Sequence, residues 1–143
     1  MNLSIIAVGR MRDEPEAALF HRYAQRIRPS LQLTEVDSKK HLVGSVPRGA
    51  FVVALDEAGR APDSLTFAQL LERWLRSGRP VCFLIGGADG LDAATLKRAD
   101  VTLSLGPLTW PHLLARAMLV EQIYRARAIA AGHPYHRAGR PDQ

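Results

Sequence analysis

Cysteine is nearly absent from this 143-residue sequence, and long apolar runs are missing altogether. The single cysteine, Cys82, excludes a disulfide within one chain, and its place inside an apolar run predicts a small buried side chain in a reducing compartment. No apolar stretch approaches the ~20 residues that span a bilayer, and the start, MNLSIIAVGR, lacks the basic and apolar regions of a signal peptide. We therefore expect a soluble, cytoplasmic protein.

Familiar phosphate-binding motifs are also missing. The sequence contains no G-x-x-x-x-G-K-[ST], and its first predicted strand ends in AVGRMRD rather than in G-x-G-x-x-G. A metal site would have to use His133 and His136 with His112 nearby, because no further cysteine or paired carboxylates complete a ligand set. These absences argue against a P-loop enzyme, a dinucleotide-binding first strand and a metalloenzyme.

The residues that are present are typical of one globular domain, since 47% are hydrophobic and 23% are charged. Basic residues outnumber acidic ones by 19 to 14, and this net charge of +5 favours a polyanionic partner. Sixteen of the 19 basic residues are arginine, so codon usage is an alternative explanation of the same charge.

Strand and helix patterns alternate along the chain. Short apolar or alternating runs predict strands at 3–9, 31–37, 50–59, 81–85 and 101–105. Helical patterns lie between Asp13 and Pro29, between Ser64 and Gly78, at 92–99, and from about Pro111 to Ala131. This order predicts an α/β fold with a mostly parallel sheet flanked by helices.

The predicted helices differ in how they begin and in how much of their surface is apolar. Asp13 with Glu16 forms a capping-box pattern, and Ser64 and Asp92 are suited to cap the next two helices. The last helix is apolar over most of its circumference, so it must be buried on two sides. One side is the sheet, and the other is either a second subunit, giving a homodimer, or a crowded core within one chain.

Three glycines in five positions, Gly86, Gly87 and Gly90, follow the apolar run PVCFLI. Open parallel sheets bind ligands at the carboxyl ends of their strands, although a bare G-G-x-x-G also marks an ordinary turn. The preceding strand ends with Leu55 and Asp56, and the following one leads into LSLGPLTWPH. Leucines and backbone amides from three strand ends suit a flat heterocycle. These segments contain no lysine or arginine that would bind a phosphate.

Together, FLIGGADGL, LSLGPLTWPH and the ending HPYHR resemble the small SPOUT-class methyltransferases that modify 23S ribosomal RNA. The resemblance covers residues 1–137 and is densest from residue 80 onward. It implies methylation of N3 of a pseudouridine in 23S rRNA with S-adenosylmethionine as methyl donor. Methyl transfer from a sulfonium needs no metal, so we expect none. Because the protein is small and we expect no separate RNA-binding domain, we expect the assembled ribosome to present the substrate. The resemblance also implies a homodimer formed through the last helix.

The resemblance further implies one SPOUT domain over residues 1–143, with a deep C-terminal trefoil knot whose loops bind the cofactor. Such a knot is an exception to the rule that chains do not thread their own loops. The positions that match the cofactor-binding residues are Leu55, Gly86, Leu105, Gly106, Pro107, Leu108, Thr109 and Trp110. Asp56, Asp89 and Asp92 are further candidates to face the positively charged sulfonium.

Within HPYHR, the resemblance assigns Tyr135, His136 and Arg137 to the catalytic site. Methylation of N3 requires loss of its proton, so His136 is a candidate base and Arg137 a candidate partner of a phosphate or of the deprotonated ring. Tyr135 is placed to stack on the base or to bond to it. From the residues alone, a helix C-cap followed by a basic tail is the favoured explanation of this segment.

Two segments depart from the family pattern. The connection 38–50 is short and contains glycine and proline, so we expect no full helix there, and the extension AGRPDQ follows Arg137. Lys39, Lys40, His41 and Arg48 form either an RNA-contacting patch or a solvated loop. Two other functions stay open: a SPOUT methyltransferase of another RNA such as tRNA, and a non-catalytic ribosome-associated or RNA-binding factor.

Overall fold

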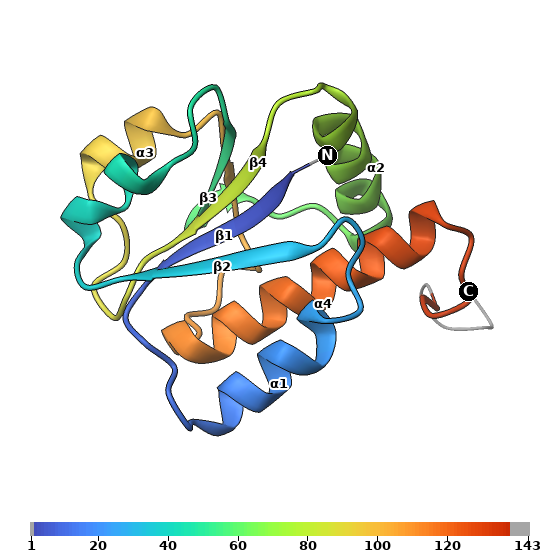
Figure 1. Cartoon of the computed structure of the whole chain (residues 1–143), viewed down its shortest axis with the longest axis horizontal. Coiled ribbons are helices and arrows are strands. Elements are labelled where there is room, and N and C mark those ends of the chain that lie inside the picture. Colours follow the sequence, from blue (N-terminus) through green and yellow to red (C-terminus); the bar gives the residue numbers. More distant parts are fainter. Residues whose placement is uncertain (1, 138–143) are drawn as a thin grey trace.

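Five parallel strands form one sheet with helices on both faces in a computed structural model that describes residues 2–137 (Figure 1). The elements are β1 (Leu3–Val8), α1 (Pro15–Ala24), β2 (Leu31–Val36), the 3-10 turns η1 (Lys39–His41) and η2 (Val43–Ser45), β3 (Phe51–Arg60), α2 (Ser64–Arg76), β4 (Val81–Ile85), α3 (Ala93–Arg98), β5 (Val101–Leu103) and α4 (His112–Ala130). The strand order is β2-β1-β4-β3-β5, and all four pairings are parallel. The predicted α/β class is therefore confirmed, and the extension 138–143 lies outside the described residues.

The two faces of the sheet carry cores of different size. Leu3, Ile5 and Ala7 of β1 belong to the larger core, which α1, α2 and α4 complete on one face. Ile6 belongs to a smaller core on the other face, where the connection between β2 and β3 contributes the fully buried Leu42. As expected, this connection forms no full helix, only the turns η1 and η2.

The starts of two helices differ from the prediction. The predicted capping box of Asp13 and Glu16 is not formed. Helix α1 begins at Pro15, and its N-cap, Glu14, makes no side-chain hydrogen bond to the helix. Proline takes the first helical position because its φ is already helical and it has no N–H to satisfy. Helix α1 also ends at Ala24, ahead of the predicted stop at Pro29.

Helix α2 is capped by Asp63 rather than by the predicted Ser64. The Asp63 carboxylate accepts the Thr66 N–H at 2.8 Å, while the Ser64 hydroxyl donates to Gln122 of α4, also at 2.8 Å. Both residue types cap helices well, so only the packing against α4 decides between them. The predicted cap of α3 is confirmed, since Asp92 accepts the Thr95 N–H at 2.9 Å.

Helix α4 packs against both α1 and α2 on one face of the sheet. This crowded core, the alternative to a second subunit, accounts for much of its apolar circumference. Even Arg116, one of the few charged residues of this helix, is completely buried. None of the helices within residues 2–137 is long and apolar enough to cross a bilayer.

Candidate functional site

A cleft of about 350 Å³ opens at the carboxyl edge of the sheet, the edge where the parallel strands end. Its walls come from the middle of β3, from the segments that follow β4 and β5, and from the start of α4. The lining includes seven of the eight predicted cofactor residues, namely Leu55, Gly86, Leu105, Gly106, Leu108, Thr109 and Trp110. Pro107 is not part of the lining.

Close backbone contacts within the loop 86–90 require glycine at particular positions. A Cβ atom added to Gly86 would lie 2.4 Å from the Gly90 carbonyl oxygen, far inside contact distance. Gly90 itself has a φ of +73° and donates its N–H to the Gly87 carbonyl at 3.0 Å. Backbone of the same loop therefore occupies the space of a Gly86 side chain, while Gly86 itself lines the cleft.

The second wall is held by Ser104, a buried residue that the sequence patterns did not single out. Its hydroxyl accepts the Gly106 N–H at 3.0 Å and lies 3.1 Å from the Glu57 carbonyl oxygen. The Thr109 hydroxyl donates to the Glu57 carboxylate at 3.1 Å. These bonds tie the segment after β5 to Glu57 of β3, so two walls of the cleft are joined.

The chemistry of the cleft is apolar and acidic. Leu108 and Trp110 keep 67% and 38% of their surface exposed at its rim, which is unusual for such large apolar side chains. Asp56, Glu57 and Asp89 line it, and no lysine or arginine of residues 2–137 does. The cleft therefore suits a small molecule with an apolar part and a positive charge rather than a phosphate.

Arg116 links the start of α4 to the end of β1 beneath this cleft. Its guanidinium bonds the Glu35 carboxylate at 2.7 Å and the carbonyls of Val8 and Gly9 at 3.0 and 3.2 Å. The same Glu35 oxygen accepts the Met11 N–H at 3.0 Å. Burial lowers the pKa of Arg116, and the bond to Glu35 opposes that shift.

This link bears on the cleft through its neighbours. Ala115, beside Arg116 in the chain, lines the cleft, and Val8 lies 3.3 Å from the position of a Cβ atom on Gly87. No local sequence pattern predicts the pair of Arg116 and Glu35, because the two residues lie 81 positions apart in the chain. The feature that could have indicated this link was an arginine on the most apolar of the predicted helices.

The C-terminal tail folds back onto α4. The Tyr135 hydroxyl donates to Glu121 at 2.7 Å, and Arg125 pairs with the same carboxylate oxygen at 2.7 Å. The Arg125 guanidinium also lies 4.9 Å from the centre of the Tyr135 ring and 2.9 Å from His136 Nδ1. Arg137 is exposed and makes no polar contact within the described part of the chain.

A second cavity of about 590 Å³ adjoins the first between α4 and the start of α2. The two share Leu105 and Gly106 in their linings, and Glu121, the partner of Tyr135, lines the second. The structure thus brings Tyr135 next to a cavity beside the cleft. None of Tyr135, His136 and Arg137 lines the cleft itself.

The remaining candidates fall elsewhere. His112 lines the cleft while His133 and His136 lie in the tail, and residues 2–137 hold no group of three or more His, Cys, Asp and Glu placed to bind a metal. Asp92 caps α3 and does not line the cleft. Of the possible RNA patch, Lys39, Lys40 and His41 form η1 after β2, whereas Arg48 precedes β3.

Known proteins are similar to this chain both in sequence and in fold. A family described as "Predicted SPOUT methyltransferase" matches residues 1–136. "Ribosomal RNA large subunit methyltransferase H" of Gluconacetobacter diazotrophicus is 60% identical over 151 aligned positions, covering 97% of this chain and 99% of that one. The protein of the same name from Acidiphilium cryptum is 48% identical, with 97% and 96% covered.

Solved structures support the fold at much lower identity. A probable methylase family protein from Haemophilus influenzae matches with a TM-score of 0.64 and 11% identity, over 99% of this chain and 73% of that one. The SpoU methyltransferase AviRb of Streptomyces viridochromogenes, in complex with AdoMet, matches with a TM-score of 0.55 and 15% identity, over 88% and 58%. With the family match over nearly the whole chain, these findings show that the chain belongs to the SPOUT methyltransferase family.

Proposed function

We propose that this chain is an S-adenosylmethionine-dependent methyltransferase that methylates N3 of a pseudouridine in large-subunit ribosomal RNA, in the assembled ribosome. The observation that carries the proposal is the cleft at the carboxyl edge. It gathers seven residues that match the family's cofactor positions, in a chain 60% identical to a protein named for methylation of this RNA. The trefoil knot and the single-domain organisation are part of the proposal.

The cleft fits the cofactor by its charge and shape. Bound S-adenosylmethionine supplies a methyl group on a positively charged sulfonium. Leu55, Leu105 and Leu108 offer apolar surface for a flat adenine ring. The carboxylates of Asp56, Glu57 and Asp89 stabilise a positive charge nearby, and no basic side chain of the described residues opposes it.

Tyr135 acts as a hydrogen-bond donor and not as the base that takes the N3 proton. Burial and the hydrogen bonds to Glu121 and Tyr23 raise the pKa of Tyr135 far above its usual range, so its hydroxyl keeps its proton. Tyr135 therefore fixes the tail on Glu121. In this role it orders the tail beside the second cavity, which adjoins the cleft.

The contact with Arg125 determines which nitrogen of the neutral His136 ring carries the proton. Arginine only donates hydrogen bonds, so the contact between Arg125 and His136 makes Nδ1 the acceptor and leaves the proton of the neutral ring on Nε2. For His136 to accept the N3 proton, it must first leave Arg125. We propose that substrate RNA displaces this contact, which would couple binding to activation of the tail.

A homodimer in the cytoplasm completes the proposal. Leu114 and Met118 of α4 stay half-buried after α1 and α2 have packed against this helix. A second copy that covers them would extend the apolar core across an interface. Static light scattering of the purified protein measures the mass directly, and a monomeric mass at micromolar concentration would remove the dimer from the proposal.

The decisive experiment is transfer of labelled methyl from S-adenosylmethionine to ribosomes from cells that lack this enzyme, with the labelled nucleotide mapped. Label on one pseudouridine of the large subunit is the expected result. Cofactor binding without label on ribosomes would point to another RNA such as tRNA as substrate. Absence of both label and cofactor binding would favour a non-catalytic factor. Protein-free rRNA labelled as fast as ribosomes would refute the requirement for the assembled particle.

A further inference from the structure

Charge is divided between the two edges of the sheet. The amino edge comprises the helix ends and connections that lead into the strands, 21–30, 46–50, 72–80, 97–100 and 127–130. It holds ten basic residues, Arg22, Arg26, Arg28, Arg48, Arg73, Arg76, Arg79, Lys97, Arg98 and Arg127, and two acidic ones, Glu72 and Asp100. The connections of the carboxyl edge, 9–16, 37–45, 56–63, 86–92 and 104–112, hold five basic and nine acidic residues.

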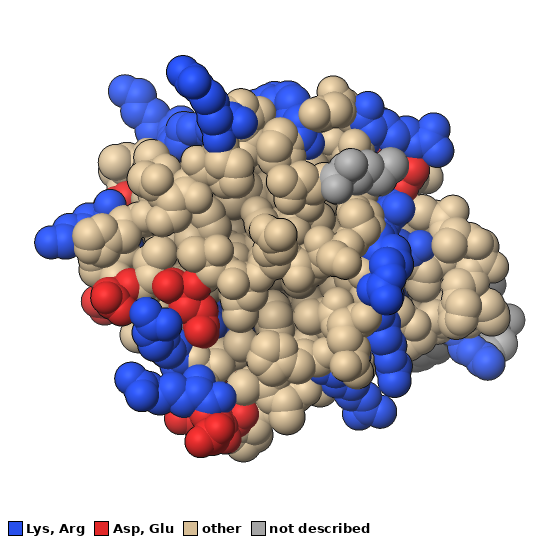
Figure 2. Space-filling view, in the orientation of Figure 1, with Lys and Arg blue, Asp and Glu red and all other residues tan. Residues whose placement is uncertain are grey.

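Figure 2 shows the same division on one face of the molecule. Most acidic side chains gather at the lower left, where α1 and α4 begin, and are mixed with basic ones. Along the upper and right-hand margins, where α2 ends, the charged side chains are nearly all basic. Basic side chains thus outnumber acidic ones along these margins, although others also lie at the left of this face.

Helix ends explain part of this pattern, because acids favour helix starts and bases favour helix ends. The two amino-edge carboxylates are also already engaged. Glu72 pairs with both Arg76 and Arg127, and Asp100 accepts the Val52 N–H at 2.8 Å and faces Arg79 and Arg98. The surplus of positive charge is therefore not neutralised within the edge.

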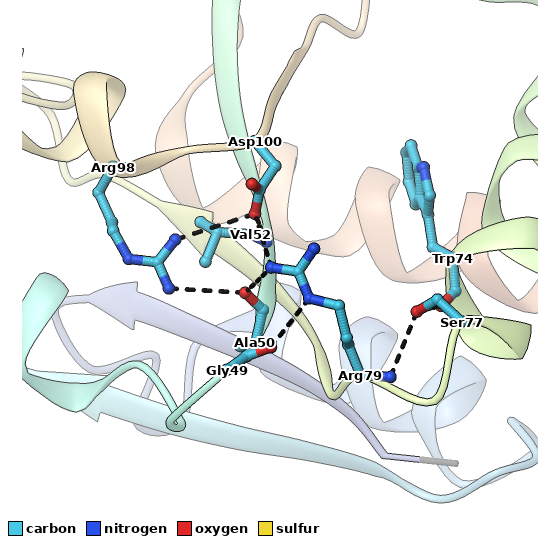
Figure 3. A network of polar contacts seen from close by, with 8 residues as sticks. All are labelled: Gly49, Ala50, Val52, Trp74, Ser77, Arg79, Arg98 and Asp100. Carbon is cyan, nitrogen blue, oxygen red and sulfur yellow. Dashed lines mark hydrogen bonds and ion pairs between the residues drawn. The ribbon is translucent and has the colours of Figure 1, made fainter.

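Some of the arginines brace the backbone and hold the edge rigid. Arg79 donates to the carbonyls of Gly49 and Ala50 at 3.0 and 2.9 Å, so it ties the entry of β4 to that of β3 (Figure 3). Arg127 likewise donates to the Arg28 carbonyl at 2.9 Å and joins the ends of α4 and α1. These braces place several guanidinium groups on one fixed surface.

Other arginines make no such contacts. Arg22, Arg26 and Arg73 are exposed, and their side chains form no hydrogen bond or ion pair within residues 2–137. Arg48 and Lys97 are likewise exposed and unbonded within residues 2–137, and a folded protein gains little from five such charges on one edge. They are, however, the groups that a row of phosphates would neutralise with release of counterions.

We infer that the amino edge is a docking surface for the phosphate backbone of a large folded RNA. The inference rests on the proposed function for the identity of that RNA. The acid-rich carboxyl edge provides little attraction for RNA beyond the cleft, so affinity must come from another surface. Since α4 with its 19 residues spans about 28 Å between the edges, the RNA that binds here must extend well beyond the target nucleotide.

The test compares two triple charge reversals of the full chain. R22E, R26E and R73E together reverse three unbonded charges of the amino edge, and K39E, K40E and R60E reverse three exposed charges of the carboxyl edge. We expect the amino-edge variant to bind purified large subunits at least about tenfold more weakly, and the slope of log affinity against log salt to shrink by about two. S-adenosylmethionine affinity should stay unchanged in both variants.

Each outcome decides one claim. Equal loss of ribosome binding in both variants, or a larger loss in the carboxyl-edge variant, would overturn the docking surface. Weaker binding to large subunits with unaltered binding to protein-free 23S rRNA would also overturn it, since the partner would then be a ribosomal protein. If the wild-type chain binds the cofactor but neither binds nor methylates large subunits, the proposed function fails instead.

Discussion

At the carboxyl edge of the sheet, the segments after β4 and β5 turn on glycines and border a cleft, whereas at the amino edge arginine side chains cover the backbone. Gly86, Gly90 and Gly106 shape the first edge. Arg79 and Arg28 occupy the second and bond carbonyls that lead into strands or end a helix. The same parallel strands thus end in two surfaces of opposite chemistry.

The difference shows that the ligand-binding cleft and the arginine side chains that stabilise the backbone lie at opposite edges of the same sheet. Backbone carbonyls at the amino edge find partners inside the protein, as buried or half-buried polar groups require. At the carboxyl edge, glycine allows the chain to turn back tightly and leaves a hollow between three loops. We therefore expect substitutions at the carboxyl edge to act on the cofactor, and substitutions at the amino edge to act on stability or RNA binding alone.

The largest effect should follow from Gly86→Val. Its side chain would overlap the Gly90 backbone, so the loop must open and the cleft must lose one wall. We expect the affinity for S-adenosylmethionine to fall more than a thousandfold, about 4 kcal/mol, as measured by calorimetry. Gly44→Ala is the matched control, since a Cβ atom there meets nothing within 4 Å. Normal affinity in a folded Gly86→Val protein would show that the cofactor binds elsewhere.

The second effect concerns the buried link under the cleft. Arg116→Met removes a buried guanidinium and leaves Glu35 without its partner, so the free energy of unfolding should drop by about 3 kcal/mol. The estimate is at the low end because the Glu35 side chain stays 21% exposed. Urea unfolding measures it, with Arg76→Met as a control at a surface pair whose arginine is 74% exposed. Similar losses in both variants would contradict the special role of Arg116.

Arg79→Ala should separate the two edges most clearly. It deletes two bonds to carbonyls and a contact with the Phe51 ring, so we expect a loss of about 1 to 2 kcal/mol in unfolding free energy. Cofactor affinity should not change, because no residue of this network lines the cleft. A joint fall of stability and affinity would mean that the edges are coupled through β3.

The smallest effect is a pH dependence at the start of α3. Hydrogen bonds from the Thr95 hydroxyl and N–H lower the pKa of Asp92. A carboxylate whose pKa is lower in the folded state stabilises the protein above its unfolded pKa of about 3.9, and this contribution is lost as pH falls through the folded pKa. Asp92→Asn should therefore match the wild type at pH 7 and lose less stability on acidification, as thermal melts from pH 7 to 3 would show. Asp89→Asn, which removes a carboxylate that caps no helix, should follow the wild-type curve instead.

Much of the fold could be predicted because it depends on neighbours in sequence. Continuous runs such as VCFLI can only be buried strands in a sheet covered on both faces, and Gly78 and Gly132 stop helices by adopting positive φ. The predicted cofactor residues came from motifs that resemble a family, and seven of those eight positions line one cleft. Two helix starts were predicted wrongly. Helix α1 begins at Pro15 because proline suits the first helical position, and α2 is capped by Asp63 rather than by the equally suitable Ser64.

By itself, the sequence determined the order of strands and helices, the family and the three segments that border the cleft, because each is written in a short run of residues. Only the tertiary structure decided that Arg116 is buried against Glu35 and Val8, 81 and 108 residues away, and that the space beside Gly86 belongs to Gly90. It alone gathered ten basic residues from five segments on one edge. The physical reason is that burial and electrostatic fields depend on distances in space, which a linear pattern does not contain.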